Sequence, residues 1–170
     1  HLLSNDNKSL AVSFVNPFSY YMIKDNFEKY SGLDGFFVDG ALLRTCLYFK
    51  YGTKVNRISF DYSSSADDFL LFCESNKLIV SFVGATEEEL INAFGYFKAR
   101  DPKLIVGFSH NGYFSSSEFT HILHGISQSD VVIIGMGAPF QEDIAIKIKD
   151  NTNVKLAITC GGFITQTAMK

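Results

Sequence analysis

The sequence predicts an α/β protein of Rossmann-like type, in which a mostly parallel sheet of about six strands carries helices on both faces. Short apolar runs alternate along the chain with stretches whose apolar residues recur at helical spacing. One run, residues 131–134 (VVII), is apolar at every position, which is typical of a strand buried on both faces of a parallel sheet. Glycine and polar residues directly follow the runs, where open parallel sheets bind their ligands.

The composition is that of one globular domain spanning residues 1–170. The chain is 46% hydrophobic and contains 17 Phe, which suffices for a single Phe-rich core. Its net charge of -3 and the lack of a basic block argue against a nucleic-acid partner. No stretch reaches the length of a transmembrane helix, and no signal peptide is visible. Cys46, Cys73 and Cys160 lie in apolar contexts and are expected to be buried free thiols of a reduced compartment, the cytoplasm.

Short runs bounded by turn residues are predicted as strands. In chain order they are residues 10–16, 35–38, 78–83, 103–108, 131–134 and 155–159. Pro17 ends the first of them, because the residue before a proline avoids the helical region. Residues 55–61 alternate in character, and both an edge strand and an extended loop fit them.

The segments between the strands are predicted as helices from the spacing of their apolar residues. They cover residues 18–30, 41–51, 66–76, 87–98 and 116–126, and a last helix has Pro139 at its first position. Ser65 is the expected N-cap of the third helix. Thr86 and Glu89 have the spacing of a capping box at the start of the fourth. Ser116 or Ser117 is expected to cap the fifth.

The residues that follow the strands should gather at one edge of the sheet and form a binding site. They are Asn16, Asp39, Gly84, residues 109–114, residues 135–141, Gly161 and Gly162. Gly135 and Gly137 allow a ligand to approach the backbone closely, and the N-terminus of the following helix presents unpaired N–H groups that suit a phosphate. A glycine turn at this place also occurs for packing reasons alone, and the spacing leaves both interpretations open.

Several common chemistries lack their motifs in this chain. There is no GxxxxGK[ST] loop and no GxGxxG fingerprint, which argues against a P-loop NTPase and a standard dinucleotide fold. No G-x-S-x-G elbow occurs. His121 and His124 lie three residues apart on a predicted helix, but no further ligand completes a metal shell, so they are expected to be solvated. A D-x-D pair, which would hold a divalent ion on a nucleotide-sugar diphosphate, is also absent.

Several segments, in this order and spacing, resemble the WecG/TagA/CpsF glycosyltransferases. They are Asn16-Pro17, Val38-Asp39-Gly40, Gly112-Tyr113-Phe114, GMGAPFQE at residues 135–142, and Gly161-Gly162-Phe163. The resemblance extends from Leu10 to the end of the chain, and the G-x-P-x-Q-E element is its most specific part. It implies transfer of an N-acetylmannosamine-type sugar or a related hexose from a UDP donor to a polyprenyl-diphosphate-linked acceptor.

The resemblance also implies the setting of the reaction. Such enzymes serve the synthesis of wall teichoic acid, enterobacterial common antigen or capsule in bacteria. They are described as inverting and metal-independent, so neither a metal nor another cofactor is expected. The implied place is the cytoplasm, peripherally at the inner face of the plasma membrane. Family members form dimers or trimers, which leaves a homo-oligomer open.

Individual roles follow from the resemblance. Asp39 is the expected general base that deprotonates the acceptor hydroxyl, and partial burial would raise its pKa to suit that role. The alternative for Asp39 is a cap on the following helix. Asn16 is expected to position donor or acceptor, Gln141 to touch the donor sugar or its phosphate, and Glu142 to orient the loop. The cation that stabilises the departing diphosphate is Arg57 or Lys54, with a slight preference for Arg57.

The remaining substrate-binding residues implied by the resemblance supply backbone or ring surface. The nucleotide wall is expected from Gly112, Tyr113, Gly135 and Gly137. The others are Gly84, Pro139, Gly161 and Gly162.

The chain departs from the family pattern in several places. The segment after the second helix lacks the usual Arg-Val-[ST]-Gly-x-Asp pattern, Phe14 stands where a polar residue is common, and Ile164 replaces an Asp. The chain also stops at Lys170, so we expect that it lacks a C-terminal tail that closes the site and touches the membrane, and that it is weakly active without it. A second hypothesis is a nucleotide-sugar binding domain without catalysis.

Overall fold

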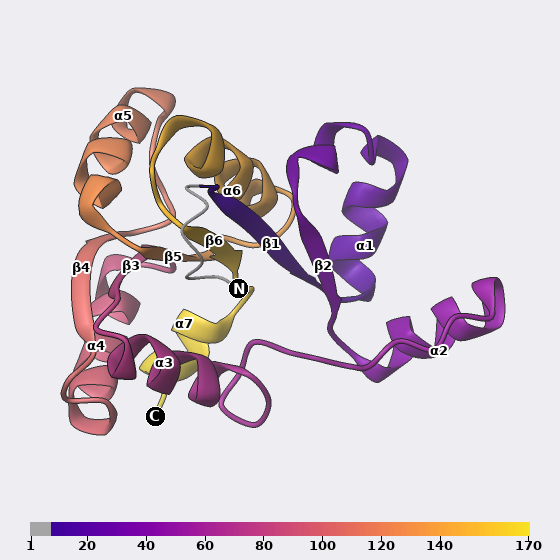
Figure 1. Cartoon of the computed structure of the whole chain (residues 1–170), viewed down its shortest axis with the longest axis horizontal. Helices are drawn as coiled ribbons and strands as arrows, with labels where there is room; N and C mark the ends of the chain where they lie inside the picture. Colours follow the sequence, from indigo (N-terminus) through magenta and orange to yellow (C-terminus); the bar gives the residue numbers. More distant parts are fainter. Residues whose placement is uncertain (1–7) are drawn as a thin grey trace.

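The computed structural model describes residues 8–170, which fold around a six-stranded sheet of entirely parallel strand pairs. The spatial order is β2-β1-β6-β5-β3-β4 (Figure 1). The strands are β1 (Leu10–Val15), β2 (Gly35–Val38), β3 (Ile79–Gly84), β4 (Ile105–His110), β5 (Val131–Gly135) and β6 (Leu156–Thr159). The predicted Rossmann-like α/β fold with a mostly parallel sheet is confirmed.

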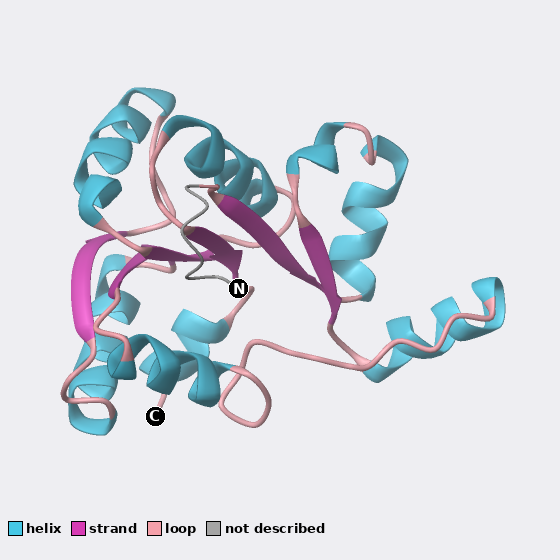
Figure 2. Cartoon of the chain, viewed as in Figure 1, coloured by secondary structure: helices cyan, strands magenta, loops and turns pink. Residues whose placement is uncertain are grey.

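The helices cover both faces of the sheet. They are α1 (Pro17–Ile23), α2 (Ala41–Tyr51), α3 (Ala66–Ser75), α4 (Glu87–Arg100), α5 (Ser116–Gly125), α6 (Phe140–Asn151) and α7 (Phe163–Ala168). In the view of Figures 1 and 2, α5 and α6 lie above the sheet, α3, α4 and α7 lie below it, and α1 lies to the right of β2. In contrast to these helices, α2 extends away from the body of the protein.

β5 joins the cores on the two faces. Val131 and Ile133 belong to the core beneath α3, α4 and α7, whereas Val132 and Ile134 belong to the core beneath α5 and α6. This alternation explains why the run is apolar at every position: a central strand covered on both faces has no solvent side. The core on the side of α3 and α4 is rich in Phe, as the composition predicts, with Phe14, Phe60, Phe82, Phe97 and Phe163 buried in it.

The helix predicted over residues 18–30 is shorter in the structure. α1 ends at Ile23, and two 3₁₀ turns, Lys24–Asn26 and Lys29–Gly32, continue the chain. Polar residues follow Ile23, so the helix has no apolar stripe to extend there. The tighter turns instead bring Tyr30 into the core, where it is buried.

The ends of two other helices are shifted from their expected positions. Ser115, rather than Ser116 or Ser117, forms the capping box of α5, because its backbone N–H donates to the Glu118 carboxylate at 2.7 Å. Pro139 is the N-cap of α6 rather than its first helical residue. The capping box of Thr86 and Glu89 at α4 is present as predicted.

Three further features differ from expectation or were left open. Cys46 is exposed, because α2 stands off the body, whereas Cys73 and Cys160 are buried as predicted. Residues 55–61 form a loop with one isolated bridge between Val38 and Arg57. α7 was not predicted, because its sequence, FITQTA, shows no clear helical periodicity.

In the part of the chain that the structure describes, none of the helices has both the length and the apolar character of a membrane span.

Candidate active site

A cavity of about 530 Å³ opens at the carboxyl edge of the sheet. Every strand end contributes to its wall: Asn16 after β1, Asp39 after β2, Ala85 and Thr86 after β3, Gly112 and Tyr113 after β4, Gly135 to Ala138 after β5, and Cys160 to Gly162 after β6. A parallel sheet directs all its carboxyl ends to one edge, and the connections there are free to form a ligand site. The cavity therefore lies where the sequence analysis expects the site.

Most of the predicted site residues line this cavity. They are Asn16, Asp39, Gly112, Tyr113, Gly135, Gly137, Gln141, Gly161 and Gly162. Four others do not: Arg57, Gly84, Pro139 and Glu142. The roles assigned to the lining residues stay predictions, but the structure brings these residues together from all parts of the chain.

Gly84 does not line the cavity, and its assignment to substrate binding stays a prediction; the structure gives a packing reason for a glycine at this position. It is buried, with a backbone φ of +146°. A Cβ atom at this position would lie 2.2 Å from the carbonyl oxygen of Gly135 in the neighbouring strand. Only glycine permits this approach of β3 and β5 at their ends, where the cavity begins.

Pro139 and Glu142 also lie outside the cavity wall. Pro139 starts α6, and its carbonyl accepts a hydrogen bond from the Asp143 N–H at 3.2 Å. Glu142 is fully buried behind the wall. Neither residue lines the cavity, and their assignment to substrate binding stays a prediction.

Asp39 lies directly after β2, where its backbone N–H donates to the Val15 carbonyl at 2.8 Å. Burial raises the pKa of its carboxyl group, the nearby Arg57 guanidinium opposes this rise, and Asp61 adds to it. The net pKa is above the ordinary value of 3.8. The alternative role as a helix cap is not seen, because Gly40 is the N-cap of α2 and no side chain caps that helix. A half-buried carboxylate with a raised pKa is suited to accept a proton.

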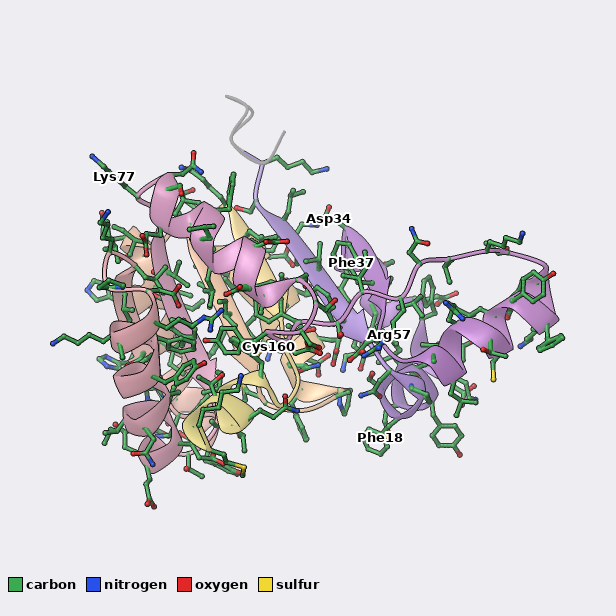
Figure 3. All side chains as sticks on the ribbon, turned by 90° about the horizontal axis from the view of Figure 1, so that it is seen from below. Phe18, Asp34, Phe37, Arg57, Lys77 and Cys160 are labelled. Carbon is green, nitrogen blue, oxygen red and sulfur yellow. The ribbon has the colours of Figure 1, made fainter. Side chains whose placement is uncertain are left out.

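Arg57 stands beside the cavity and Lys54 stands apart from it. Arg57 acts electrostatically on the pKa of Asp39, and its guanidinium donates to Ser59 Oγ at 3.4 Å. Figure 3 shows Arg57 at the same end of the sheet as Phe18, which lines the cavity. Lys54 lies instead in a separate groove along α2. The geometry therefore favours Arg57 over Lys54 as the cation near the departing diphosphate.

Asn16 has a structural task that partly fixes its orientation. Its Oδ1 accepts hydrogen bonds from the Ser19 N–H at 2.9 Å and from Ser19 Oγ at 3.1 Å, and so caps α1. The amide nitrogen of Asn16 makes no such contact among the described residues. Asn16 therefore presents a hydrogen-bond donor, rather than an acceptor, to a ligand.

A buried polar network supports Gln141 from behind. Gln141 Nε2 donates to Glu142 Oε1 at 3.0 Å, and Ser13 Oγ donates to the same oxygen at 2.8 Å. Thr159 Oγ1 in turn donates to Ser13 Oγ at 2.9 Å and accepts the Phe14 N–H at 3.1 Å. The network ties α6 to β1 and β6, and it holds the amide of Gln141 against the cavity.

Two oxygens of this network have no partner in the part of the chain that the structure describes. They are Gln141 Oε1 and Glu142 Oε2, both buried. Buried oxygens in native proteins are normally hydrogen-bonded, and each one left unpaired costs about 1–3 kcal/mol. Because the nitrogen of Gln141 is held by Glu142, its oxygen is the atom left to accept from a ligand hydroxyl or a water.

Sequence reasoning missed several residues of the site. Ser13 and Thr159 lie within the predicted strands and have no predicted role in the site. A polar residue inside an apolar strand is nevertheless a sequence signal, because a buried polar side chain needs a hydrogen-bond partner. The cavity wall further includes Phe14, Asp61, Thr165 and Gln166, which carry no local motif, and Glu89, whose local motif is the capping box of α4.

The charged side chains that line the cavity are all acidic: Asp39, Asp61 and Glu89. Among the described residues no Lys or Arg side chain lines it, so Arg57 at its edge and the backbone N–H groups are the positive groups close to a ligand. Residues 8–170 contain no cluster of three or more His, Cys, Asp or Glu side chains arranged to hold a metal ion.

Comparisons with known proteins agree with this geometry. A family model described as the glycosyl transferase WecG/TagA/CpsF family matches residues 1–170. A curated relative from Shigella boydii is 40% identical over 171 residues, which cover 99% of this chain and 72% of the relative. Its name is UDP-Gal:alpha-D-GlcNAc-diphosphoundecaprenol beta-1,4-galactosyltransferase.

Proposed function

Because this chain belongs to the WecG/TagA/CpsF glycosyl transferase family, and is therefore a UDP-sugar glycosyltransferase, we propose which sugar it moves and how. The donor is a UDP-hexose, with galactose as the first candidate, and the acceptor is N-acetylglucosamine on a polyprenyl diphosphate. The name of the 40% identical relative supports galactose over the N-acetylmannosamine-type sugar implied by the family resemblance. Polysaccharide synthesis at the cytoplasmic face of a bacterial membrane is the matching setting.

One observation carries the mechanism: a carboxyl group with a raised pKa shares a cavity with a buried amide and several glycine N–H groups. Asp39 takes the proton of the acceptor hydroxyl as its oxygen bonds to the anomeric carbon of the donor. The bond from that carbon to the diphosphate breaks at the same time, and UDP leaves with its electron pair. A single base is enough for such an in-line displacement, which inverts the anomeric centre. The name of the relative specifies a β-1,4 linkage in its product, and forming a β linkage from an α-linked nucleotide sugar is an inversion.

The surroundings of Asp39 assign the other parts of the reaction. Charge develops on the departing diphosphate, and we place it against the glycine turn after β5 and the N-terminus of α6. Arg57 adds the nearest side-chain cation. The Gln141 carbonyl oxygen accepts a hydrogen bond from a hydroxyl of the donor sugar, and this contact gives the otherwise unpaired oxygen a partner. We propose that the reaction needs no metal, because the sequence has no D-x-D pair to hold one on the diphosphate.

The test compares the wild type with Asp39→Asn, using UDP-galactose, UDP-N-acetylglucosamine and UDP-N-acetylmannosamine as donors and a lipid-diphosphate N-acetylglucosamine as acceptor. Asp39→Asn should lower kcat by about 10²–10⁴-fold, which is the usual contribution of a general base. The variant should keep its thermal stabilisation by UDP, since a ligand that binds the native state raises the melting point. We expect galactose transfer that persists in EDTA.

Each part of the proposal has its own contrary result. Wild-type protein that binds UDP but transfers no sugar would support the non-catalytic hypothesis. Undiminished transfer by Asp39→Asn would exclude Asp39 as the base. A preference for N-acetylmannosamine would refute the donor assignment alone, and loss of transfer in EDTA would refute metal independence.

A further inference from the structure

α2 leaves most of its surface uncovered. Within Ala41–Tyr51, which the structure describes in full, Leu43 is the one buried residue. On a neighbouring side of the helix, Leu42 and Phe49 are 64% and 81% exposed, and Cys46 between them is exposed as well. The spacing of these three residues, i, i+4 and i+7, places them in one stripe along the helix. A helix that projects from the body with an apolar stripe facing solvent marks an interaction surface.

Exposed aromatic side chains also lie on α1, and one of them lines the cavity. Phe18 and Tyr21 of α1 are 64% and 67% exposed. Phe18 also lines the cavity, and Figure 3 shows it pointing outward at the end of the sheet where Arg57 lies. Asp39 precedes α2 with only Gly40 between them. Whatever covers this surface therefore lies next to the mouth of the cavity.

The charge of this region is opposite to that of the whole protein. Residues 40–60 contain Arg44, Lys50, Lys54 and Arg57 and no acidic residue, whereas the chain as a whole has a net charge of -3. Arg44, Lys50 and Lys54 form no ion pair with another described residue, whereas Arg57 lies near Asp39 and belongs to the cavity side of this region. Cations without acidic partners, set among aromatic side chains, complement a surface that is both apolar and negatively charged.

A groove beside α2 combines the same two features. It has a volume of about 440 Å³ and lies between α2 and the segment that returns to the body. Arg44 and Lys54 supply positive charge to its wall, and Tyr48 and Phe49 supply rings. This pairing suits a phosphate group attached to hydrocarbon, which is the chemistry of a phospholipid at the boundary between headgroups and acyl chains.

We propose that α2, together with Phe18 and Tyr21 of α1, docks on an anionic phospholipid bilayer. Leu42, Cys46 and Phe49 enter the boundary between headgroups and acyl chains, while the cations of α2 lie over lipid phosphates. The inference rests on the proposed function in one respect: a polyprenyl-linked acceptor has its diphosphate at the bilayer surface. Docking through α2 brings the cavity mouth to that level. A second copy of the chain fits less well, because a symmetric contact through α2 would bring the unpaired cations of both copies together.

The experiment measures co-sedimentation of the chain, without substrates, with two kinds of vesicle. One kind contains phosphatidylglycerol and phosphatidylcholine in equal parts, and the other contains phosphatidylcholine alone. The wild type should partition more strongly onto the anionic vesicles, and added salt should weaken this preference. The double substitution Leu42→Ser with Phe49→Ser should lower partitioning at least about ten-fold, because both apolar side chains are lost from the interface.

Lys50→Glu tests the electrostatic part of the proposal. One basic residue near an anionic surface is worth about 1 kcal/mol, or roughly five-fold in partitioning, and charge reversal should exceed that. The matched controls are Ile91→Ser and Lys98→Glu on α4. Ile91 has the same exposed fraction as Leu42, 64%, and both control residues lie on the exposed side of a helix that packs on the body. These controls should partition like the wild type.

Equal binding to both kinds of vesicle, or a double variant that binds like Ile91→Ser, would overturn the proposal. So would a dimer in analytical ultracentrifugation that the double substitution dissociates, because α2 would then be an interface between copies. Failure of the proposed function is separate: it would appear as absent transfer to a detergent-soluble acceptor, with vesicle binding intact. If both inferences hold, the double variant keeps its rate on the soluble acceptor and loses it on acceptor embedded in vesicles.

Discussion

Replacing Glu142 by Ala tests whether the buried network positions Gln141. Glu142 and Ser13 are completely inaccessible to solvent and Gln141 is 2% exposed, so water cannot replace a lost partner without rearrangement. The substitution removes the acceptor of two hydrogen bonds, from Ser13 Oγ at 2.8 Å and from Gln141 Nε2 at 3.0 Å. Each buried donor left unpaired costs about 1–3 kcal/mol, which gives a loss of about 2–6 kcal/mol.

Two other effects modify this figure. The substitution also removes Glu142 Oε2, which has no partner among the described residues, and the relief of that buried oxygen offsets about 1–3 kcal/mol of the loss. The cavity left by the side chain acts in the opposite direction. We therefore expect the free energy of unfolding to fall by about 2–4 kcal/mol, which urea denaturation measures directly. That is a large part of the roughly 5–15 kcal/mol available to a domain.

The same substitution should affect catalysis through Gln141. Without Glu142 the amide of Gln141 is free to turn, and misplacement of a substrate-positioning group by about 1 Å can reduce the rate about 100-fold. The expected change is in kcat, with UDP affinity retained. Glu142→Gln keeps one oxygen to accept both hydrogen bonds, so it should restore most of the rate and stay within about 1 kcal/mol of wild-type stability.

Glu88→Ala on the exposed start of α4 is the control, and it should change the free energy of unfolding by no more than about 0.5 kcal/mol. The reasoning is refuted if Glu142→Ala unfolds at the same urea concentration as this control. It is refuted equally if Glu142→Gln loses as much rate as Glu142→Ala, because a hydrogen-bonded positioning role requires rescue by the amide.

Three further predictions concern stability. Gly84→Ala should lower the free energy of unfolding by about 3 kcal/mol or more, since the new Cβ would overlap Gly135. The melting temperature measures this effect, and a variant that melts at the wild-type temperature would contradict the packing role. Asp39→Asn should raise the melting temperature at pH 7. Burial raises the folded-state pKa of Asp39, so its ionised carboxylate opposes folding at pH 7. The difference in melting temperature should vanish at low pH, where the wild-type carboxyl group is protonated. Burial works against the ionised form of Asp34 too, but hydrogen bonds from Lys149 and the Ala11 N–H hold its pKa below the ordinary 3.8. The stability that Asp34 contributes is therefore present above that value and lost as the pH falls through the folded-state pKa, and Asp34→Asn should flatten this acid decline in urea titrations.

The strands and the location of the site could be predicted because their signals are local. The run at 131–134 needs two covered faces whatever surrounds it, and residues such as Asn16 and Asp39 follow strands whose carboxyl ends must share an edge. The network behind Gln141 has no local signal. Ser13 lies 129 residues from Glu142 and 146 from Thr159, and only the order of strands in the sheet makes them neighbours.

The exposure of Cys46 on α2 and the packing at Gly84 both depend on neighbours that the sequence does not show. The apolar spacing of a helix predicts that its apolar side packs against something, and on that ground Cys46 of α2 is expected in the core. The spacing does not say whether the packing partner belongs to the same chain, and in the structure Cys46 is exposed. Likewise a glycine after a strand serves either ligand approach or backbone packing. At Gly84 the neighbouring carbonyl of Gly135 decides for packing, and that contact is invisible in the sequence.

Each of the six strand ends supplies part of the cavity wall, so a substrate bound there would contact several separate connections. Tyr113 after β4 and Met136 after β5, for example, belong to different connections. Loops accept replacements and insertions that packed strands do not. If the donor binds in this cavity as proposed, a homologue can acquire a new donor by exchanging one connection while the sheet stays unchanged.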